Sequence, residues 1–195
     1  MKINILIVGV GGQGAITTAA VIARAAMMEN LNVLTAETHG MAQRGGSVEV
    51  HVRLGDVKSP LIPIGSADYV IALEPSEALR YSAYLNENTF VILNDRAIIP
   101  HAVSLGIAEY PKLDDIVIAL RSITDKVMVV NASEIAEKVG SIRTTNVVVI
   151  GMLAKLGLPL SYESIEKAIE DVVPEKFVEM NKKALKAGYD AIRTE

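Results

Sequence analysis

Short apolar runs alternate with longer amphipathic segments over the first two thirds of the chain. The apolar runs have the length and β-branched composition of buried parallel strands; they are Ile3–Val8, Asn32–Ala36, Asp68–Leu73, Thr89–Leu93 and Lys126–Val130. The segments between them predict helices; these are Ala15–Met28, Ser76–Tyr84, a region near Asp114–Ser122, and Ser133–Val139. This alternation predicts the α/β class, with an open, mostly parallel sheet that carries helices on both faces.

One segment has a different pattern. From Val48 to Arg53 valines alternate strictly with polar residues, so that Glu49 and His51 fall on the face opposite the valines. Such alternation is typical of a strand with one buried and one solvated face. We therefore expect a half-exposed, antiparallel strand near an edge of the sheet.

The last third of the chain is predicted to be mainly helical. Ser141–Leu156 has an apolar centre, Ser161 is placed to cap the following helix, and Pro174 begins the last one.

Because we find no repeat or low-complexity tract, we expect residues 1–195 to form a single domain. No apolar run approaches the roughly 20 residues that span a bilayer, and the first strand continues into a glycine motif rather than a signal-peptide pattern. The expected location is cytoplasmic.

Composition excludes several kinds of site. With no cysteine, the chain alone cannot form a disulfide or hold an iron–sulfur cluster. With no tryptophan, 4% aromatic residues and a net charge of −4, nucleic-acid binding is not expected. Hydrophobic residues make up 50% of the chain and mean hydropathy is +0.33. Either the helices are buried on several sides, or a large face is buried against a partner, which is the interpretation we favour.

A glycine-rich motif, G-x-G-x-x-G, follows the first predicted strand and opens the first helix. Its residues are Gly9, Gly11, Gly12, Gln13 and Gly14. This motif permits a tight turn, close approach of a ligand to the backbone, and free N–H groups that attract anions at the helix start. Glu37, at the end of the second strand, stands where a dinucleotide-binding protein places an acid for the ribose. Gln13 is expected to donate to a ligand or partner, or to be solvated.

A second glycine-rich segment lies between the second strand and the alternating strand. It contains Thr38, Gln43, Arg44, Gly45 and Gly46. In an open α/β sheet this segment faces the same crevice as the first motif, and Arg44 could offer a guanidinium to a phosphate or carboxylate. The alternative is a loop with one solvated arginine.

No catalytic or metal-binding constellation stands out. His39, His51 and His101 lack the spacing of metal ligands, and no nucleophile elbow or Walker lysine is present. We predict neither a catalytic residue nor a metal site in this chain.

Together, these motifs resemble the gamma-type subunits of the 2-oxoacid:ferredoxin oxidoreductases. The resemblance rests on the first glycine motif, on Glu37–Ser47, on Val48–Arg53, on Ser59-Pro60 and on Asp68–Glu74, and it covers about residues 3 to 190. Within this family the chain is most similar to the small beta subunits of indolepyruvate:ferredoxin oxidoreductases.

The resemblance implies an accessory subunit that is inactive alone. The family's enzyme decarboxylates an aryl 2-oxoacid, reduces ferredoxin and transfers the acyl group to coenzyme A. Thiamine diphosphate and the iron–sulfur clusters would lie in a large, cysteine-rich partner subunit, which would also contact ferredoxin. This chain would cover the active site, and its two glycine-rich segments would help to bind coenzyme A. Made alone, it could form a homodimer.

Two other functions remain open from the residues alone. One is a stand-alone oxidoreductase that binds NAD(P) or a flavin through a Rossmann-like glycine loop. The other is a nucleotide-binding module without enzymatic activity.

Overall fold

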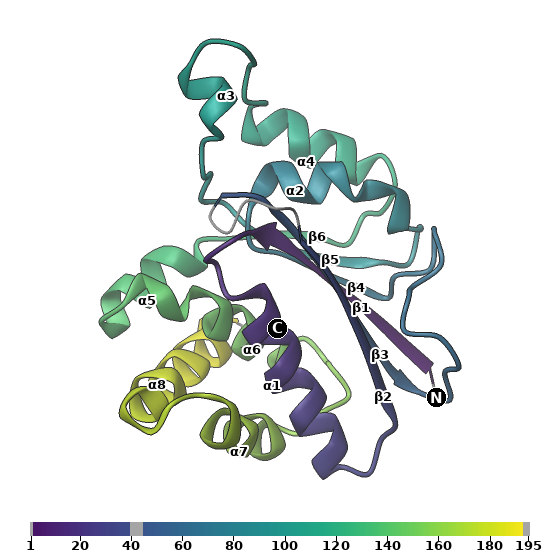
Figure 1. The fold of residues 1–195 in the computed structure, drawn as a ribbon, viewed down its shortest axis with the longest axis vertical. Coiled ribbons are helices and arrows are strands. Elements are labelled where there is room, and N and C mark those ends of the chain that lie inside the picture. The colour runs from purple at the N-terminus through teal and green to yellow at the C-terminus, as the bar shows by residue number, and fades with distance from the viewer. Residues whose placement is uncertain (1, 40–44, 193–195) are drawn as a thin grey trace.

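The computed structural model describes residues 2–39 and 45–192 as one six-stranded sheet flanked by helices (Figure 1). The strands are β1 (Lys2–Val10), β2 (Val33–His39), β3 (Ser47–Gly55), β4 (Tyr69–Ala72), β5 (Phe90–Asn94) and β6 (Val127–Val130). The α-helices are α1 (Ala15–Met28), α2 (Pro75–Arg80), α3 (His101–Ser104), α4 (Leu113–Arg121), α5 (Ala132–Val139), α6 (Thr145–Lys155), α7 (Tyr162–Val172) and α8 (Glu175–Ala191). Two 3₁₀ turns, η1 (Ser82–Tyr84) and η2 (Ile142–Thr144), complete the described elements.

The sheet separates two hydrophobic cores. Along β1, Ile5 and Ile7 face the larger core, whereas Leu6 and Val8 face the smaller one. Helices α1 and α5–α8 cover the first face, and α2 and α4 cover the second (Figure 1). All four side chains are fully buried, which explains why the strand is apolar throughout rather than alternating. The predicted α/β class with helices on both faces is confirmed.

The strand order is β2-β3-β1-β4-β5-β6. Strands β1, β4, β5 and β6 are parallel to one another, whereas β3 pairs antiparallel with both β1 and β2. The sheet is thus mostly parallel, as expected, but β2 is an edge strand with only an antiparallel partner. The prediction of a buried parallel strand at Asn32–Ala36 was wrong in this respect.

The antiparallel direction predicted for Val48–Arg53 is confirmed, but its half-exposed position is wrong. Strand β3 lies between β1 and β2, and both His51 and Arg53 are buried. The segment after β3 folds back over these side chains: Arg53 Nη1 donates to the carbonyls of Ser59 and Leu61, and Ile62 N–H donates to His51 Nδ1. Polar residues therefore alternate with valines here because a loop satisfies them, not because water does.

The helical C-terminal third has the predicted organisation. Ser161 Oγ accepts from the Ser164 N–H at the start of α7, and Pro174 precedes α8. Helices α6 and α8 cross with their backbones in contact, since a Cβ at Gly188 would lie 2.0 Å from the Val148 carbonyl oxygen. None of the helices within residues 2–39 and 45–192 has the length and apolar character needed to cross a membrane.

Candidate functional site

The glycine motif forms a tight turn between β1 and α1. Gly12 and Gly14 have φ angles of +101° and +83°, a region that side-chain-bearing residues rarely adopt. A Cβ at Gly12 would meet no atom within 4 Å, so this position opens onto space, whereas one at Gly14 would lie 2.8 Å from Asn146 Nδ2. The two glycines thus serve different purposes: Gly12 leaves room above the turn, and Gly14 allows α6 to approach the start of α1.

Gln13 fastens the turn to the sheet. Its Oε1 accepts from the Val10 N–H at 2.9 Å, and its Nε2 donates to the Leu73 carbonyl at 2.8 Å. A Cβ at Gly9 would lie 2.8 Å from that same Oε1, so Gly9 is required for the amide to fold back over β1. Gln13 was expected to donate to a ligand or partner, or to be solvated; in the structure its amide links the end of β1 to Leu73, the residue that follows β4.

The second glycine-rich segment meets the first. Gly11 N–H donates to the Gly46 carbonyl at 2.8 Å, and Gly45 N–H donates to the Gly11 carbonyl at 3.3 Å. Directly after it, Ser47 Oγ contacts the buried carboxylate of Glu77 and lies 2.9 Å from the Tyr81 hydroxyl, so α2 anchors this segment. The two segments therefore contact each other through the backbone at Gly45 and Gly46.

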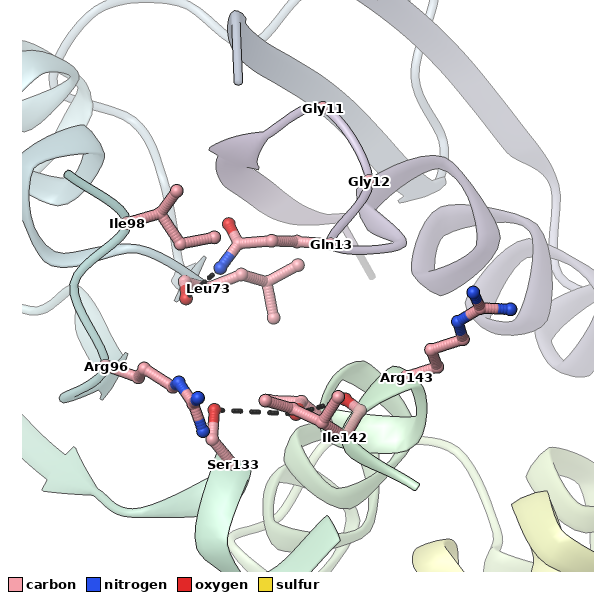
Figure 2. Close-up of a pocket in the computed structure, with 10 residues that line it drawn as sticks. Gly11, Gly12, Gln13, Leu73, Arg96, Ile98, Ser133, Ile142 and Arg143 are labelled. Atoms are coloured by element: carbon pink, nitrogen blue, oxygen red, sulfur yellow. Dashed lines mark hydrogen bonds between the residues drawn. The ribbon is translucent and has the colours of Figure 1, made fainter. Parts of the chain in front are cut away.

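Beside the glycine turn lies a pocket of about 270 Å³. It is lined by Gly11, Gly12, Gln13, Leu73, Arg96, Ile98, Ser133, Ile142, Arg143 and Thr145. Figure 2 shows the glycine turn above the pocket, Ile98 and Arg96 on one side, Ile142 below, and Arg143 on the other side. The pocket therefore lies where the carboxyl ends of the parallel strands meet, which is the usual ligand position in open α/β sheets.

The lining combines apolar side chains with positive charge. Leu73, Ile98 and Ile142 supply the apolar surface, and Arg96 and Arg143 are the charged residues among those that line the pocket. Arg96 Nη1 contacts Glu137 Oε1 at 2.6 Å, and both of these side chains are about half exposed, so a ligand could compete for the arginine. This combination suits a ligand that carries both anionic and apolar parts.

Of the remaining sequence-predicted residues, those that the structure describes, Gly45 and Gly46 included, do not line this pocket. Gly9 and Gly14 support the turn from behind, and Thr38 is exposed on the edge strand β2. Gln43 and Arg44 lie outside the described residues. Glu37, considered as a ribose-binding acid, is exposed on β2, and all of β3 separates it from β1.

Several pocket residues were missed from the sequence. Arg96 and Ile98 directly follow β5, so the rule that ligands bind at carboxyl ends of strands could have indicated them. Ile142 and Arg143 come from the turn before α6, far along the chain from the glycine motif. No local pattern marks them, since only the packing of α6 against α1 brings them to the turn.

A buried carboxylate organises the side of the pocket formed by Ile98. Glu74 is fully buried, and it accepts from the Ile98 N–H at 3.2 Å and from the Tyr110 hydroxyl at 2.5 Å. Its other donors are the Ser76 hydroxyl and the Glu77 N–H at the start of α2. Burial and the neighbouring carboxylate raise the pKa of Tyr110 well above its usual range, so that its hydroxyl remains a donor.

Within the described residues, no group of three or more His, Asp or Glu side chains is arranged to hold a metal ion. His51 Nε2 lies 2.9 Å from Glu49 Oε1, but this contact is on β3 and not at the pocket.

Comparison with known proteins agrees with the geometry. The chain is 62% identical over 191 residues to the indolepyruvate oxidoreductase subunit IorB of Archaeoglobus fulgidus, covering 97% of this chain and 95% of that protein. It is 29% identical to the pyruvate/ketoisovalerate oxidoreductases common subunit gamma of Pyrococcus furiosus, over 93% and 92% of the two chains.

Solved structures show the same fold. The keto/oxoacid ferredoxin oxidoreductase gamma subunit of Geobacter sulfurreducens matches with a TM-score of 0.71 and 26% identity, covering 96% of both chains. The 2-oxoglutarate:ferredoxin oxidoreductase of Magnetococcus marinus matches with a TM-score of 0.73 and 21% identity, over all of this chain and 32% of that one. The family model described as pyruvate ferredoxin/flavodoxin oxidoreductase matches residues 4–191. The chain therefore belongs to the pyruvate ferredoxin/flavodoxin oxidoreductase family.

Proposed function

We propose that this chain is the small subunit of an indolepyruvate:ferredoxin oxidoreductase and that its pocket contributes to coenzyme A binding. The observation that supports the subunit assignment most strongly is 62% identity, over almost the full length of both chains, to a protein named indolepyruvate oxidoreductase subunit. The full enzyme would convert an aryl 2-oxoacid, coenzyme A and two oxidised ferredoxins into acyl-CoA, carbon dioxide, one proton and two reduced ferredoxins.

The chemistry of this chain supports a division of labour between subunits. Electron transfer to ferredoxin requires redox centres, and the chain has no cysteine with which to hold an iron–sulfur cluster. We place the clusters and thiamine diphosphate in a large partner subunit, where decarboxylation and electron transfer would occur. The small subunit would then bind and orient the acyl acceptor and keep water from the reacting groups.

The pocket beside the glycine turn supports the coenzyme A role. Coenzyme A carries pyrophosphate and a ribose phosphate at one end and a weakly polar pantetheine arm at the other. The guanidinium groups of Arg96 and Arg143 suit the phosphates, and Leu73, Ile98 and Ile142 suit the arm. At Gly12, the open space above the turn lets a ligand approach the backbone directly.

Two glycines in similar conformations allow a controlled test. Gly12 and Gly157 have φ angles of +101° and +96°, and a Cβ at either would meet no atom within 4 Å. The Gly157 carbonyl accepts from the hydroxyl of Tyr69, the first residue of β4. Leu73, which lines the pocket, follows the other end of that strand. Leucine at either position introduces the same left-handed backbone strain of about 1–2 kcal/mol, but only Gly12→Leu fills space beside the pocket.

In the complex with its large subunit, we expect Gly12→Leu to raise the apparent KM for coenzyme A at least tenfold and Gly157→Leu to leave it within twofold. Both variants should melt at a similarly reduced temperature and assemble with the large subunit. Equal KM values for Gly12→Leu and the unmodified complex would contradict the coenzyme A role. A purified chain that forms no complex with the large subunit would contradict the subunit assignment.

The structure does not favour the alternative of a dinucleotide-dependent enzyme. In a dinucleotide-binding fold the ribose-binding acid ends the strand adjacent to the glycine-loop strand. Here the antiparallel strand β3 occupies that place and puts Glu37 two strands away from β1, a distance of roughly 9–10 Å.

A further inference from the structure

An apolar arm projects from the body of the protein next to the pocket. We define the arm as residues 97–108, which include α3 and connect β5 to α4. In Figure 1 the arm extends beyond α2 and α4, at the end of the molecule where β1 terminates. It carries Ile98, Ile99, Leu105 and Ile107, which are 39%, 50%, 72% and 76% exposed. Among the described residues, Leu105 and Ile107 are the most exposed large hydrophobic side chains.

The arm also lacks formal charge. Residues 97–108 contain no Asp, Glu, Lys or Arg, although such residues make up 22% of the whole chain, and His101 is the only titratable side chain within it. Solvent-exposed loops carry polar and charged residues, whereas an exposed apolar patch without charge is typical of a surface that another molecule covers. The surface that covers the arm must itself be apolar and uncharged.

The arm is held in place at its base. The buried Glu74 carboxylate accepts from the Ile98 N–H at the start of the arm and from the Tyr110 hydroxyl just after its end. Within the arm, the Ile107 N–H donates to the Ala102 carbonyl at 2.8 Å, and this hydrogen bond holds the turn that follows α3. A protruding apolar segment fixed by a buried carboxylate presents a preformed surface, which lowers the entropic cost of binding.

The arm is continuous with the pocket. Ile98 belongs to both, and Ile142 on the opposite wall is also 40% exposed. A surface that packs on the arm at Ile98 therefore borders the pocket.

We propose that the arm is the docking surface for the large, thiamine-binding subunit, through an apolar and uncharged patch on that subunit. This inference rests on the proposed function, because the pocket must face the subunit in which the acyl group is formed. Packing of the large subunit on the arm places its active site beside the glycine turn and excludes water from both.

The test measures the affinity of the purified chain for the purified large subunit of the same enzyme. The test variant is Leu105→Glu with Ile107→Glu, which puts two charges on the arm. The matched control is Ile64→Glu, since Ile64 is 66% exposed. It belongs to the loop whose Ser66 carbonyl accepts from Asn4 Nδ2, near the first residues of β1 and away from the pocket. All of these side chains are exposed, so the melting temperatures of the isolated variants should remain within about 2 °C of the unmodified chain.

We expect the arm variant to raise the dissociation constant for the large subunit at least a hundredfold and the control to change it less than threefold. An arm variant that binds the large subunit as tightly as the unmodified chain overturns the proposal. So does an arm variant that loses only self-association, because the arm would then be a contact between copies of this chain. If the unmodified chain itself does not bind the large subunit, it is the proposed function that fails.

Discussion

The crossing of α6 and α8 allows a stability prediction whose sign is set by geometry. Gly188 faces the Val148 carbonyl on α6, and Gly151 faces the Leu185 carbonyl on α8. Glycine in the middle of a helix usually destabilises it, and replacement by alanine usually gains up to about 1 kcal/mol. At Gly188 we expect the opposite result, because the new methyl group would collide with backbone atoms rather than with a movable side chain.

The size of the effect follows from the distances. A Cβ at Gly188 would lie 2.0 Å from the Val148 oxygen and 2.8 Å from its carbonyl carbon. An ordinary contact is about 3.5 Å, so the two helices would have to separate by about 1.5 Å at the crossing. Overpacking of this kind costs about 1–3 kcal/mol, and more where no rotamer change can relieve it. With the helix-propensity gain subtracted, Gly188→Ala should destabilise the chain by about 2 kcal/mol.

Thermal unfolding followed by circular dichroism measures this change. For a chain of this size, about 2 kcal/mol corresponds to a fall in Tm of about 4–8 °C. Lys183→Ala, at an exposed position of the same helix, is the control and should change stability by less than about 0.5 kcal/mol. Gly151→Ala should resemble Gly188→Ala, and the double variant should lose less than the sum, because one separation of the helices relieves both collisions. A Tm for Gly188→Ala equal to or above that of the unmodified chain would refute the reasoning.

Two further predictions concern Arg53 on β3 and Tyr84, whose ring packs against His51 of the same strand. Arg53 is buried and donates to Asn4 Oδ1, the Ser59 carbonyl and the Leu61 carbonyl, so Arg53→Met should lower the free energy of unfolding in urea by about 3 kcal/mol. The control, Arg121→Met at an exposed position, should change this free energy little. If Arg53→Met is as stable as the unmodified chain, the loop does not depend on the guanidinium. Burial, together with the nearby Glu49 carboxylate, raises the pKa of Tyr84 from 10.0 to about 12. Since the folded state then holds this proton more tightly than the unfolded state, the stabilisation is complete below pH 10 and is lost as pH rises from 10 towards 12. Unfolding measured across this range should show a decline that is smaller in Tyr84→Phe; an identical decline in both proteins would argue against the shift.

Residues close together in the chain specify the local elements, and the alternation of those elements indicates the fold class. The strand–turn–helix of β1, the glycine turn and α1 is specified by residues adjacent in the chain: an apolar run, glycines at positive φ, and a helical period. The same holds for the alternation of later strands and helices, and for the cap at Ser161. These features depend on backbone geometry and on interactions within a few residues, so their signals are present in any short window of sequence.

Strand order and the pocket were decided only by the tertiary structure. Alternating Val48–Arg53 looked half exposed, but β2 pairs outside it and the Ser59–Ile62 segment covers its polar side chains. Arg143 lies far along the chain from Gly12 and reaches the same pocket only through the packing of the C-terminal helices. Pairing between distant strands and helices depends on which surfaces bury the most apolar area together. The two residues of each such contact lie far apart in the chain, so no local pattern carries that information.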